Sequence, residues 1–307
     1  MPHGRTTPQD PAACLLLGAG GMLGRAWTEN LRAAPPAGGA RALTRSECDI
    51  TDASDVRRAI TRGVSLVINC AAWTDVDGAE ADEAGALRLN ADAVALLADR
   101  CRDVGATLVH YSTDYVFDGA ADAAYPIDAP RAPINAYGRS KAAGEDRLEQ
   151  SGADCLIIRT SWLYAANGGN FLRTIARLCR EKPTLRVVAD QVGRPTSCDS
   201  LVGITRRLLD AGARGIHHGC NAGRCTWHGF ASAIAARINP ACAIEPCGSD
   251  DYPRPAPRPA SSVLDLSVTE SLIGPLTPWT VALDRTLDRL LEQDCTAVAG
   301  RRGSTTS

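Results

Sequence analysis

The chain has 307 residues, which is enough for one large or two small domains with a substantial core. Its 33 basic and 35 acidic side chains leave a net charge of −2, so no bulk electrostatic attraction draws it to nucleic acid or to an anionic membrane. No apolar stretch is long enough to cross a bilayer, and residues 1–13 contain no apolar signal sequence. We therefore expect a cytoplasmic enzyme or binding domain whose partners include neither nucleic acid nor membrane.

The first half of the chain alternates between apolar strands and amphipathic helices. After a flexible tail at 1–12, strands are expected at 14–17, 40–44, 66–70, 107–112 and 155–159, with helices ending near 33 and spanning 53–62, 80–104 and 136–150. Thr51 or Asp52 can cap the helix at 53–62. The strand at 66–70 is apolar throughout, as is typical of a parallel sheet covered on both faces. This alternation predicts a doubly wound parallel α/β sheet over residues 13–166.

The second half of the chain has a less regular pattern. Helices are expected at 171–180, 199–211 and 278–293, short strands at 185–189 and 215–220, and an exposed loop at 251–259, which holds four prolines. We expect residues 167–293 to form mainly a smaller α/β substrate-binding domain at the carboxyl edge of the sheet, with some segments returning to the sheet. Residues 294–307 are expected to form a second flexible tail.

Cysteine and histidine usage raises the question of disulfides and metals. The twelve cysteines contain no C-x-x-C pair, and we expect them to be reduced thiols that pack as small hydrophobes. Five potential metal ligands crowd into a short segment: His217, His218, Cys220, Cys225 and His228. Their spacing fits no standard structural zinc site, so we expect no bound metal.

A glycine pattern follows the first strand. Gly18, Gly21 and Gly24 form G-x-x-G-x-x-G between a strand and a helix, which is the context that a dinucleotide-binding loop requires. Glycines let the backbone turn tightly and approach a pyrophosphate, and the helix N-terminus presents free N–H groups to that anion. A purely structural glycine turn is the alternative. The expected cofactor contacts here are Gly18, Gly21, Met22, Leu23 and Gly24.

The end of the second strand bears on the choice of cofactor. Dinucleotide sites often carry an acidic residue there to bind a ribose hydroxyl, but here Arg45 falls at about that place. An arginine suits a 2′-phosphate, which favours NADP(H), with NAD(H) as the alternative cofactor. A solvated surface arginine is the other interpretation.

A tyrosine and a lysine four residues apart form the candidate catalytic pair. Tyr137 and Lys141 share one face of the expected helix, and Lys141 is one of only two lysines in the chain. A nearby ammonium favours the phenolate, so Lys141 is expected to lower the pKa of Tyr137 toward neutrality. Tyr137 could then protonate a carbonyl oxygen as hydride arrives. Ser112 or Thr113, at the end of a strand, could donate a hydrogen bond to the same oxygen, or could simply cap a turn.

These motifs belong to a longer series with a characteristic order. The matching segments are 18–24, 69–77, 111–117, 137–141, 159–162, 190–196 and 258–262. In this series the chain resembles the dTDP-4-dehydrorhamnose reductases, a branch of the extended short-chain dehydrogenase/reductases, over roughly residues 14–293. The Ser-Thr-Asp-Tyr-Val-Phe and Asp-Gln-x-Gly-x-Pro-Thr pieces are specific to this branch. The resemblance implies a Rossmann-type sheet and NAD(P)H-dependent reduction of a C4 keto group on a dTDP-linked 6-deoxy sugar.

The resemblance also implies roles for individual residues. Tyr137 is the acid, Lys141 holds the nicotinamide ribose and tunes Tyr137, and Thr113 polarises the C4 carbonyl. The implied cofactor contacts are Asp49 and Ile50 at the adenine, with Ala71, Ala72 and Thr74 along the cofactor. The implied substrate contacts are Tyr115, Trp162 and Asn170 on the sugar, Thr74 and Val76 nearby, and Arg258 at the diphosphate.

Two departures from the family pattern keep alternatives open. Ala26 stands where some members have a glutamate that links a dimer through magnesium, so we expect a monomer or a weak homodimer. Trp73 stands where tyrosine is common, which suggests an altered sugar, such as the precursor of dTDP-dihydrostreptose or another antibiotic deoxysugar. A non-catalytic NADP-binding regulatory subunit is a further alternative. A dehydratase is disfavoured because Thr113 precedes Asp114-Tyr115 and not an Asp-Glu pair.

Overall fold

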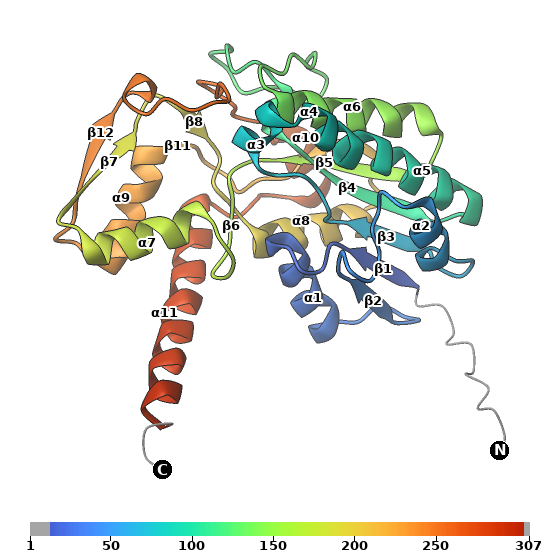
Figure 1. The fold of residues 1–307 in the computed structure, drawn as a ribbon, viewed down its shortest axis with the longest axis horizontal. Helices are drawn as coiled ribbons and strands as arrows, with labels where there is room; N and C mark the ends of the chain where they lie inside the picture. Colours follow the sequence, from blue (N-terminus) through green and yellow to red (C-terminus); the bar gives the residue numbers. More distant parts are fainter. Residues whose placement is uncertain (1–12, 304–307) are drawn as a thin grey trace.

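The computed structural model describes residues 13–303, so the predicted tail at 1–12 lies outside the described residues. Its centre is a six-stranded sheet in the order β10-β5-β4-β3-β1-β2, and all of its neighbouring strands are parallel (Figure 1). The strands are β1 (Cys14–Leu17), β2 (Ala40–Leu43), β3 (Leu66–Asn69), β4 (Thr107–Thr113), β5 (Cys155–Thr160) and β10 (Gly215–His218). The order reverses between β1 and β3, and ligands of doubly wound sheets bind beyond the carboxyl ends of the strands at such a point.

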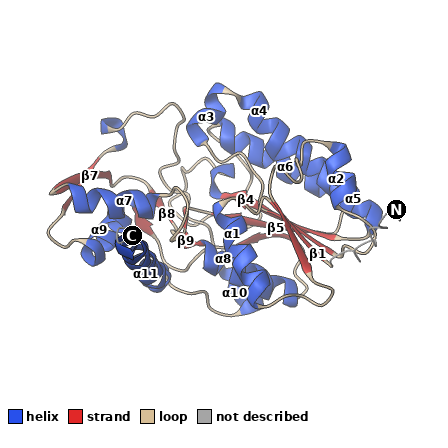
Figure 2. Ribbon diagram, turned by 60° about the horizontal axis from the view of Figure 1, so that its bottom comes forward, coloured by secondary structure: helices blue, strands red, loops and turns tan. Residues whose placement is uncertain are grey.

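Helices cover both faces of this sheet (Figure 2). One face carries α1 (Met22–Ala33), α8 (Cys198–Asp210) and α10 (Ser267–Ile273), and the other carries α2 (Ala53–Ala59), α5 (Ala93–Val104) and α6 (Ala136–Ser151). Leu16 of β1 packs into the core on one face, and Leu15 and Leu17 pack into the core on the other. An apolar strand without alternation is what two covered faces require. The predicted doubly wound α/β fold is confirmed.

The segment expected as one helix over 80–104 is divided, so that prediction is wrong. It contains α3 (Val76–Ala81), α4 (Glu83–Leu87), a π-helical turn η1 (Arg88–Asp92) and α5. The side chains of Asp75 and Asp82 accept hydrogen bonds from Gly78 N and Gly85 N, and each aspartate starts a new helix. The π turn is a local feature that no apolar spacing predicts, and such turns are frequent at functional sites.

A second lobe lies beside the carboxyl ends of the strands (Figure 1). It contains α7 (Phe171–Glu181), α9 (Trp227–Ile238), β7 (Thr184–Val188) and β12 (Ala243–Cys247), and it has its own buried cluster around Leu172, Phe230 and Leu287. Short strand pairs and turns complete the fold: β6 (Leu163–Tyr164) with β9 (Thr196–Ser197), β8 (Val192–Gly193) with β11 (Cys225–Thr226), and the 3₁₀ turns η2 (Asp114–Val116) and η3 (Ser249–Asp251). Between α7 and α9 along the chain, α8 and β10 return to the sheet layer.

The last helix, α11 (Trp279–Gly303), is longer than expected. We expected a helix at 278–293 and a tail from 294, whereas the helix continues through residues 294–303. No glycine or proline interrupts the sequence between Trp279 and Gly300, so nothing in the backbone chemistry ends the helix where its buried leucines end. Leu283, Leu287 and Leu290 anchor its first part in the second lobe. Residues 304–307 lie outside the described part of the chain.

A buried polar network joins α6 to the sheet. The Arg159 guanidinium on β5 is 2% exposed, and it donates to the fully buried carboxylate of Glu145 on α6 at 2.7 to 3.2 Å. Arg131 adds a further ion pair to Glu145 at 2.9 Å. Because an unpaired charge at this depth is costly, the pairing fixes α6 relative to β5. This matters for the site, since α6 carries Tyr137 and Lys141.

Candidate functional site

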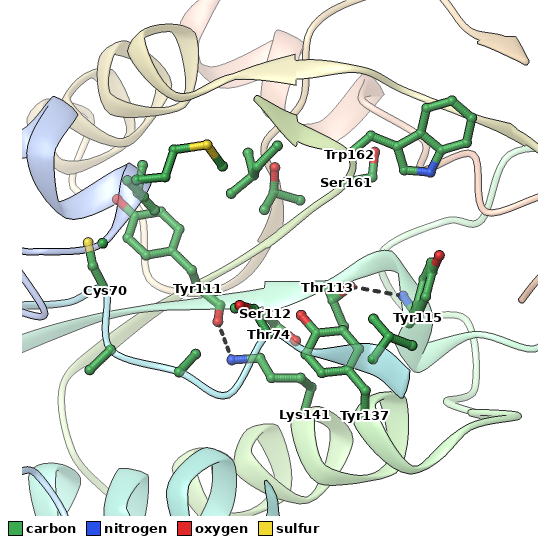
Figure 3. A pocket seen from close by; sticks show the side chains of 18 of the residues that line it. Cys70, Thr74, Tyr111, Ser112, Thr113, Tyr115, Tyr137, Lys141, Ser161 and Trp162 are labelled. Atoms are coloured by element: carbon green, nitrogen blue, oxygen red, sulfur yellow. Dashed lines mark hydrogen bonds between the residues drawn. The ribbon is translucent and has the colours of Figure 1, made fainter. Parts of the chain in front are cut away.

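A cavity of about 600 Å³ opens at the carboxyl ends of β1, β3, β4 and β5, between the sheet and the second lobe (Figure 3). Most of the predicted site residues line it. They are Gly21, Met22, Leu23, Ala71, Ala72, Thr74, Val76, Thr113, Tyr115, Tyr137, Lys141 and Trp162. The structure therefore brings the glycine turn, the Tyr–Lys pair and the expected sugar contacts to one cavity.

The glycine turn owes its shape to two positions where only glycine fits. Gly18 has φ +77°, and a Cβ there would lie 2.6 Å from Ala71 N. A Cβ on Gly24 would lie 2.1 Å from Gly18 O. Gly18 and Gly24 therefore shape the turn, while Gly21 and the start of α1 line the cavity. Gly21 is the N-cap of α1 and provides no side-chain cap, so the first N–H groups of the helix are available to an anion.

The expected adenine end lies next to this turn, outside the cavity. Ala19 N donates to Leu43 O, which joins the turn to the end of β2. Just beyond β2, the Arg45 side chain is 86% exposed, and its Nε lies 3.7 Å from Asp49 Oδ2. Asp49 also accepts hydrogen bonds from Thr51, and Ile50 is buried. An exposed arginine held only by a loose ion pair is free to bind a phosphate.

Lys141 is buried under the end of β4. Its Nζ donates to Tyr111 O at 2.6 Å and lies 3.2 Å from His110 Nε2 (Figure 3). Burial lowers the pKa of Lys141 to about 8. At neutral pH the side chain is therefore still mainly an ammonium, aimed at the floor of the cavity. The N-cap of α6, Asn135, accepts from Gly138 N at 2.7 Å and so sets where the helix begins.

Tyr137 differs electrostatically from the sequence-based prediction. Burial raises the pKa of Tyr137 to about 12, although the neighbouring Thr113 hydroxyl acts in the opposite direction. The expected lowering by Lys141 is wrong for this structure, because the phenol loses its hydration while the ammonium is directed to Tyr111 O. The consequence is a phenol that stays protonated at neutral pH. Figure 3 shows Tyr137 reaching from α6 toward Thr113 at the end of β4.

Trp162 forms part of the wall toward the second lobe. It has φ +47° and is the one non-glycine residue with a left-handed backbone within 13–303. Its indole stacks on Trp227 of α9, with ring centroids 3.6 Å apart and planes 7° apart. A Cβ on Gly193 would lie 2.4 Å from the same indole, so the ring is held on two sides. Strain of this kind persists only where packing enforces it, which is common at ligand sites.

A second cavity of about 620 Å³ shares Tyr115 and Trp227 with the first. Arg258 lines it, donates to Ala256 O at 2.6 Å and is paired with Asp77. The predicted diphosphate contact thus borders the predicted sugar contacts. Asn170 lines neither of these two cavities. Its Oδ1 caps α7 by accepting from Arg173 N, and its Nδ2 donates to Ala165 O, so the structure shows this side chain occupied within its own loop.

Several residues of the site were not expected from the sequence. Asn90, on the π turn, accepts from Trp73 N at 2.9 Å and donates to Trp73 O at 3.0 Å and to Ser140 Oγ at 2.9 Å. It thereby fixes the loop after β3 against α6. Further residues to which the sequence assigned no role also line the first cavity, among them Arg25, Asn69, Cys70, Tyr111, Asp114, Ser161 and Trp227. The Asn-Cys-Ala-Ala segment was a usable signal for Asn69 and Cys70, whereas the π turn and Trp227 had none.

The histidine and cysteine cluster is dispersed in the structure. His218 Nδ1 lies 2.8 Å from Asp265 O, and His228 Nε2 lies 3.1 Å from Ile244 O. Within 13–295 no three His, Cys, Asp or Glu side chains are grouped so that they could hold a metal. All twelve cysteines are free thiols. None of the described helices combines the length and the apolarity needed to cross a membrane.

Comparison with known proteins agrees with this geometry. The sequence profile described as "RmlD substrate binding domain" matches residues 12–292. The chain belongs to this family. It is 39% identical to a dTDP-4-dehydrorhamnose reductase of Burkholderia thailandensis over 298 residues, which is 91% of this chain and 99% of the relative. It is 40% identical to a dTDP-4-keto-6-deoxy-D-glucose reductase of Streptomyces niveus over 273 residues, 88% of this chain and 94% of that protein.

A solved structure supports the same assignment. The dTDP-4-dehydrorhamnose reductase of Bacillus anthracis, crystallised in complex with NADP, superimposes with a TM-score of 0.84 at 32% identity. The match covers 90% of this chain and 98% of that one. The structure also places the two residues that depart from the expected family pattern. Ala26 is packed in the core on α1, and the Trp73 indole donates to Asp75 O at 2.8 Å and is not among the residues that line the cavity.

Proposed function

We propose that this protein reduces the C4 keto group of a dTDP-4-keto-6-deoxyhexose with NADPH, converting dTDP-4-dehydrorhamnose to dTDP-L-rhamnose. The observation that carries the proposal is the meeting of Thr113, Tyr137 and Lys141 in the cavity that the glycine turn also borders. The names of the relatives and the NADP in the Bacillus anthracis structure support it. A division near residue 166, with the sheet binding cofactor and the second lobe binding sugar nucleotide, belongs to the same proposal. So does a monomeric or weakly dimeric state.

The cofactor end of the cavity fits NADP(H). A pyrophosphate would lie on the N–H groups at the start of α1, where Gly21 leaves them uncapped. The exposed Arg45 would pair with the 2′-phosphate, and Lys141 would hold the nicotinamide ribose. Ala71 and Ala72 would border the cofactor after β3. When bound, NADPH supplies the hydride.

The catalytic residues act on the carbonyl oxygen. Tyr137 enters the reaction protonated, because burial raises the pKa of its phenol, and it gives that proton to the C4 oxygen as hydride reaches C4. Thr113 donates a hydrogen bond to the same oxygen and stabilises the charge that develops there. The stacked pair of Trp162 and Trp227 keeps water from one side of the cavity.

The sugar nucleotide would extend from this oxygen into the second cavity. Tyr115, Trp162 and Val76 would surround the deoxysugar, and Arg258 would face the diphosphate, for which its paired N–H groups are suited. Arg258 would then exchange its present partner, Asp77, for the phosphates. Asn170 would contact the sugar only if it gave up its role as the cap of α7.

The direct test combines the pure protein with NADPH or NADH and dTDP-4-dehydrorhamnose. Cofactor oxidation is followed by absorbance at the nicotinamide band, and the product is identified by NMR. Formation of dTDP-L-rhamnose with NADPH supports the proposal. Bound cofactor without turnover of this sugar, or of a panel of other dTDP-keto sugars, would contradict a reductase and favour the regulatory alternative.

The alternatives differ in how they relate to the site. A regulatory subunit has no need for the intact trio of Thr113, Tyr137 and Lys141, and here the trio meets in one cavity. A sister reductase for another sugar would use the same chemistry, and the Streptomyces niveus relative is named for such a substrate. Trp73 does not line the cavity, but its side chain packs in the same small apolar cluster as Tyr137, so Trp73 does not decide which sugar is reduced. The panel of sugars separates these cases.

A further inference from the structure

The Thr113 hydroxyl has one proton, and two acceptors compete for it: the Asp114 carboxyl group and the substrate carbonyl oxygen. A hydroxyl offers one donor and two acceptor positions. In the structure Thr113 Oγ1 accepts from Tyr115 N at 3.2 Å and donates to Asp114 Oδ1 at 3.0 Å. To polarise a substrate carbonyl, Thr113 has to donate to that oxygen. It cannot do so while its proton is directed to Asp114.

Asp114 is placed where it can resolve this conflict. Asp114 lines the cavity and is 2% exposed, and its Oδ2 is buried without a hydrogen-bond partner. No cation is paired with it, since Lys141 donates to Tyr111 O and Arg159 is paired with Glu145. An ionised carboxylate in such a place would be unusually costly. A neutral, protonated carboxylic acid could instead donate a hydrogen bond.

We propose that Asp114 is a positioning residue that works as a neutral acid, donating its proton to Thr113 Oγ1 and thereby turning the Thr113 proton toward the C4 oxygen. In this arrangement the two acceptor positions of Thr113 are filled by Tyr115 N–H and Asp114 O–H, and its one donor is free for substrate. Asp114 keeps its proton throughout, because Tyr137 supplies the proton that the product gains. The inference rests on the proposed reduction for its kinetic test but not for its stability test.

The electrostatics of the surroundings support a neutral Asp114. Burial raises the pKa of Asp114 to about 7, and the nearby hydroxyls of Ser262 and Thr113 act in the opposite direction. The titratable groups that face it are Tyr115 on the same turn, Tyr137 from α6 and Cys220 after β10, and the pKa of each is raised by burial. All three are therefore neutral near pH 7. When Asp114 ionises at higher pH, Thr113 should turn back to it and leave the substrate.

The first test measures stability and needs no substrate. In the folded protein Asp114 keeps its proton up to about pH 7, whereas in the unfolded chain it loses it near pH 3.8, so its contribution to stability is lost as pH rises between these values. Asp114→Asn removes this loss. The Tm of Asp114→Asn minus the Tm of the wild type should therefore become more positive as the pH is raised from about 5 to about 8. The control is Asp122→Asn, the same change at an exposed carboxylate, for which the difference should stay constant.

The second test measures kcat/KM against pH with NADPH and the dTDP-keto sugar. The wild type should lose activity as pH rises through about 7, with a separate decrease near the higher pKa of Lys141. Asp114→Asn should lack the first decrease, because an amide does not titrate, and Thr113→Ser should keep it. Thr113→Val should be slower by about 10²-fold or more and should also lack the decrease, since Asp114 then has no hydroxyl to direct.

The outcomes separate the inference from the proposed function. If no dTDP-keto sugar is reduced, the function fails, and the stability test still decides whether Asp114 is neutral. If the enzyme is active and Asp114→Asn retains the decrease near pH 7, the inference is overturned. It is also overturned if the Tm difference between Asp114→Asn and the wild type does not change with pH, or if Thr113→Val keeps the decrease.

Discussion

The two ends of the cavity, proposed above to bind the cofactor and the sugar nucleotide, are built in different ways. At the cofactor end, one short segment from Gly18 to Gly24 supplies backbone N–H groups and the space for an anion. At the sugar end, Tyr115, Trp162, Trp227 and Arg258 come from four separate segments and contribute side chains. The cofactor end therefore depends on local backbone geometry, and the sugar end depends on how distant segments pack.

This difference indicates which positions of the cavity tolerate amino-acid substitution. Few sequences can form the glycine turn, because Gly18 and Gly24 have no room for a Cβ. The sugar end can vary one side chain at a time without disturbing the backbone of the turn. Relatives of 39–40% identity carry the names of different dTDP-keto sugar reductases, which agrees with a constant cofactor end and a variable sugar end.

The largest expected effect comes from a variant that removes the proton donor but leaves both ends of the cavity intact. Tyr137→Phe removes the proton donor but leaves the ring that lines the cavity. We expect kcat to fall by about 10²–10⁴-fold, with NADPH affinity unchanged when it is measured by fluorescence titration. Near-normal turnover in this variant would contradict the role of Tyr137.

The next effect tests the cofactor end. Gly18→Ala places a Cβ against Ala71 N in a backbone conformation that alanine avoids, so we expect a loss of unfolding free energy of about 2 kcal/mol or more together with weaker NADPH binding. Gly20→Ala is the matched control, because its Cβ would meet only Thr44 Cγ2 at 3.9 Å. Equal stability of the two variants in urea unfolding would show that the turn is not constrained as described.

The sugar end is tested by Arg258→Met. Loss of a charged hydrogen-bond donor to a diphosphate should raise KM for the dTDP-sugar by about 10–10²-fold, and KM for NADPH should stay the same. Arg237→Met, on the exposed face of α9 and paired with Asp284 and Asp288, is the control. A parallel increase of both KM values would mean that the two ends are coupled and that the comparison between them fails.

The smallest effect concerns the choice of cofactor. Arg45→Gln should raise KM for NADPH by about fivefold to tenfold, since an exposed arginine–phosphate contact contributes about 1 kcal/mol. KM for NADH should not change. Arg41→Gln, at an exposed position of β2, is the matched control. If Arg45→Gln affects both cofactors equally, the 2′-phosphate is bound elsewhere.

Much of the fold follows from local patterns. The apolar runs of β1 and β3 predicted a parallel sheet, and the spacing of Tyr137 and Lys141 predicted that they share a helix face. The helix over 80–104 was predicted wrongly, because Asp75 and Asp82 restart helices and a π turn follows. The pKa of Tyr137 was also predicted in the wrong direction, because spacing along a helix carries no information about burial.

The sequence by itself determined the glycine turn, the spacing of the proposed catalytic trio and the family, since these depend on residue types at short, fixed spacings. Only the tertiary structure decided that Asp114 is buried beside Thr113 without a cation, that Trp162 stacks on Trp227, and that Asn90 ties the loop after β3 to α6. The physical reason is the same in each case. Desolvation, stacking and side-chain hydrogen bonds join residues that are distant along the chain, and only packing brings them together.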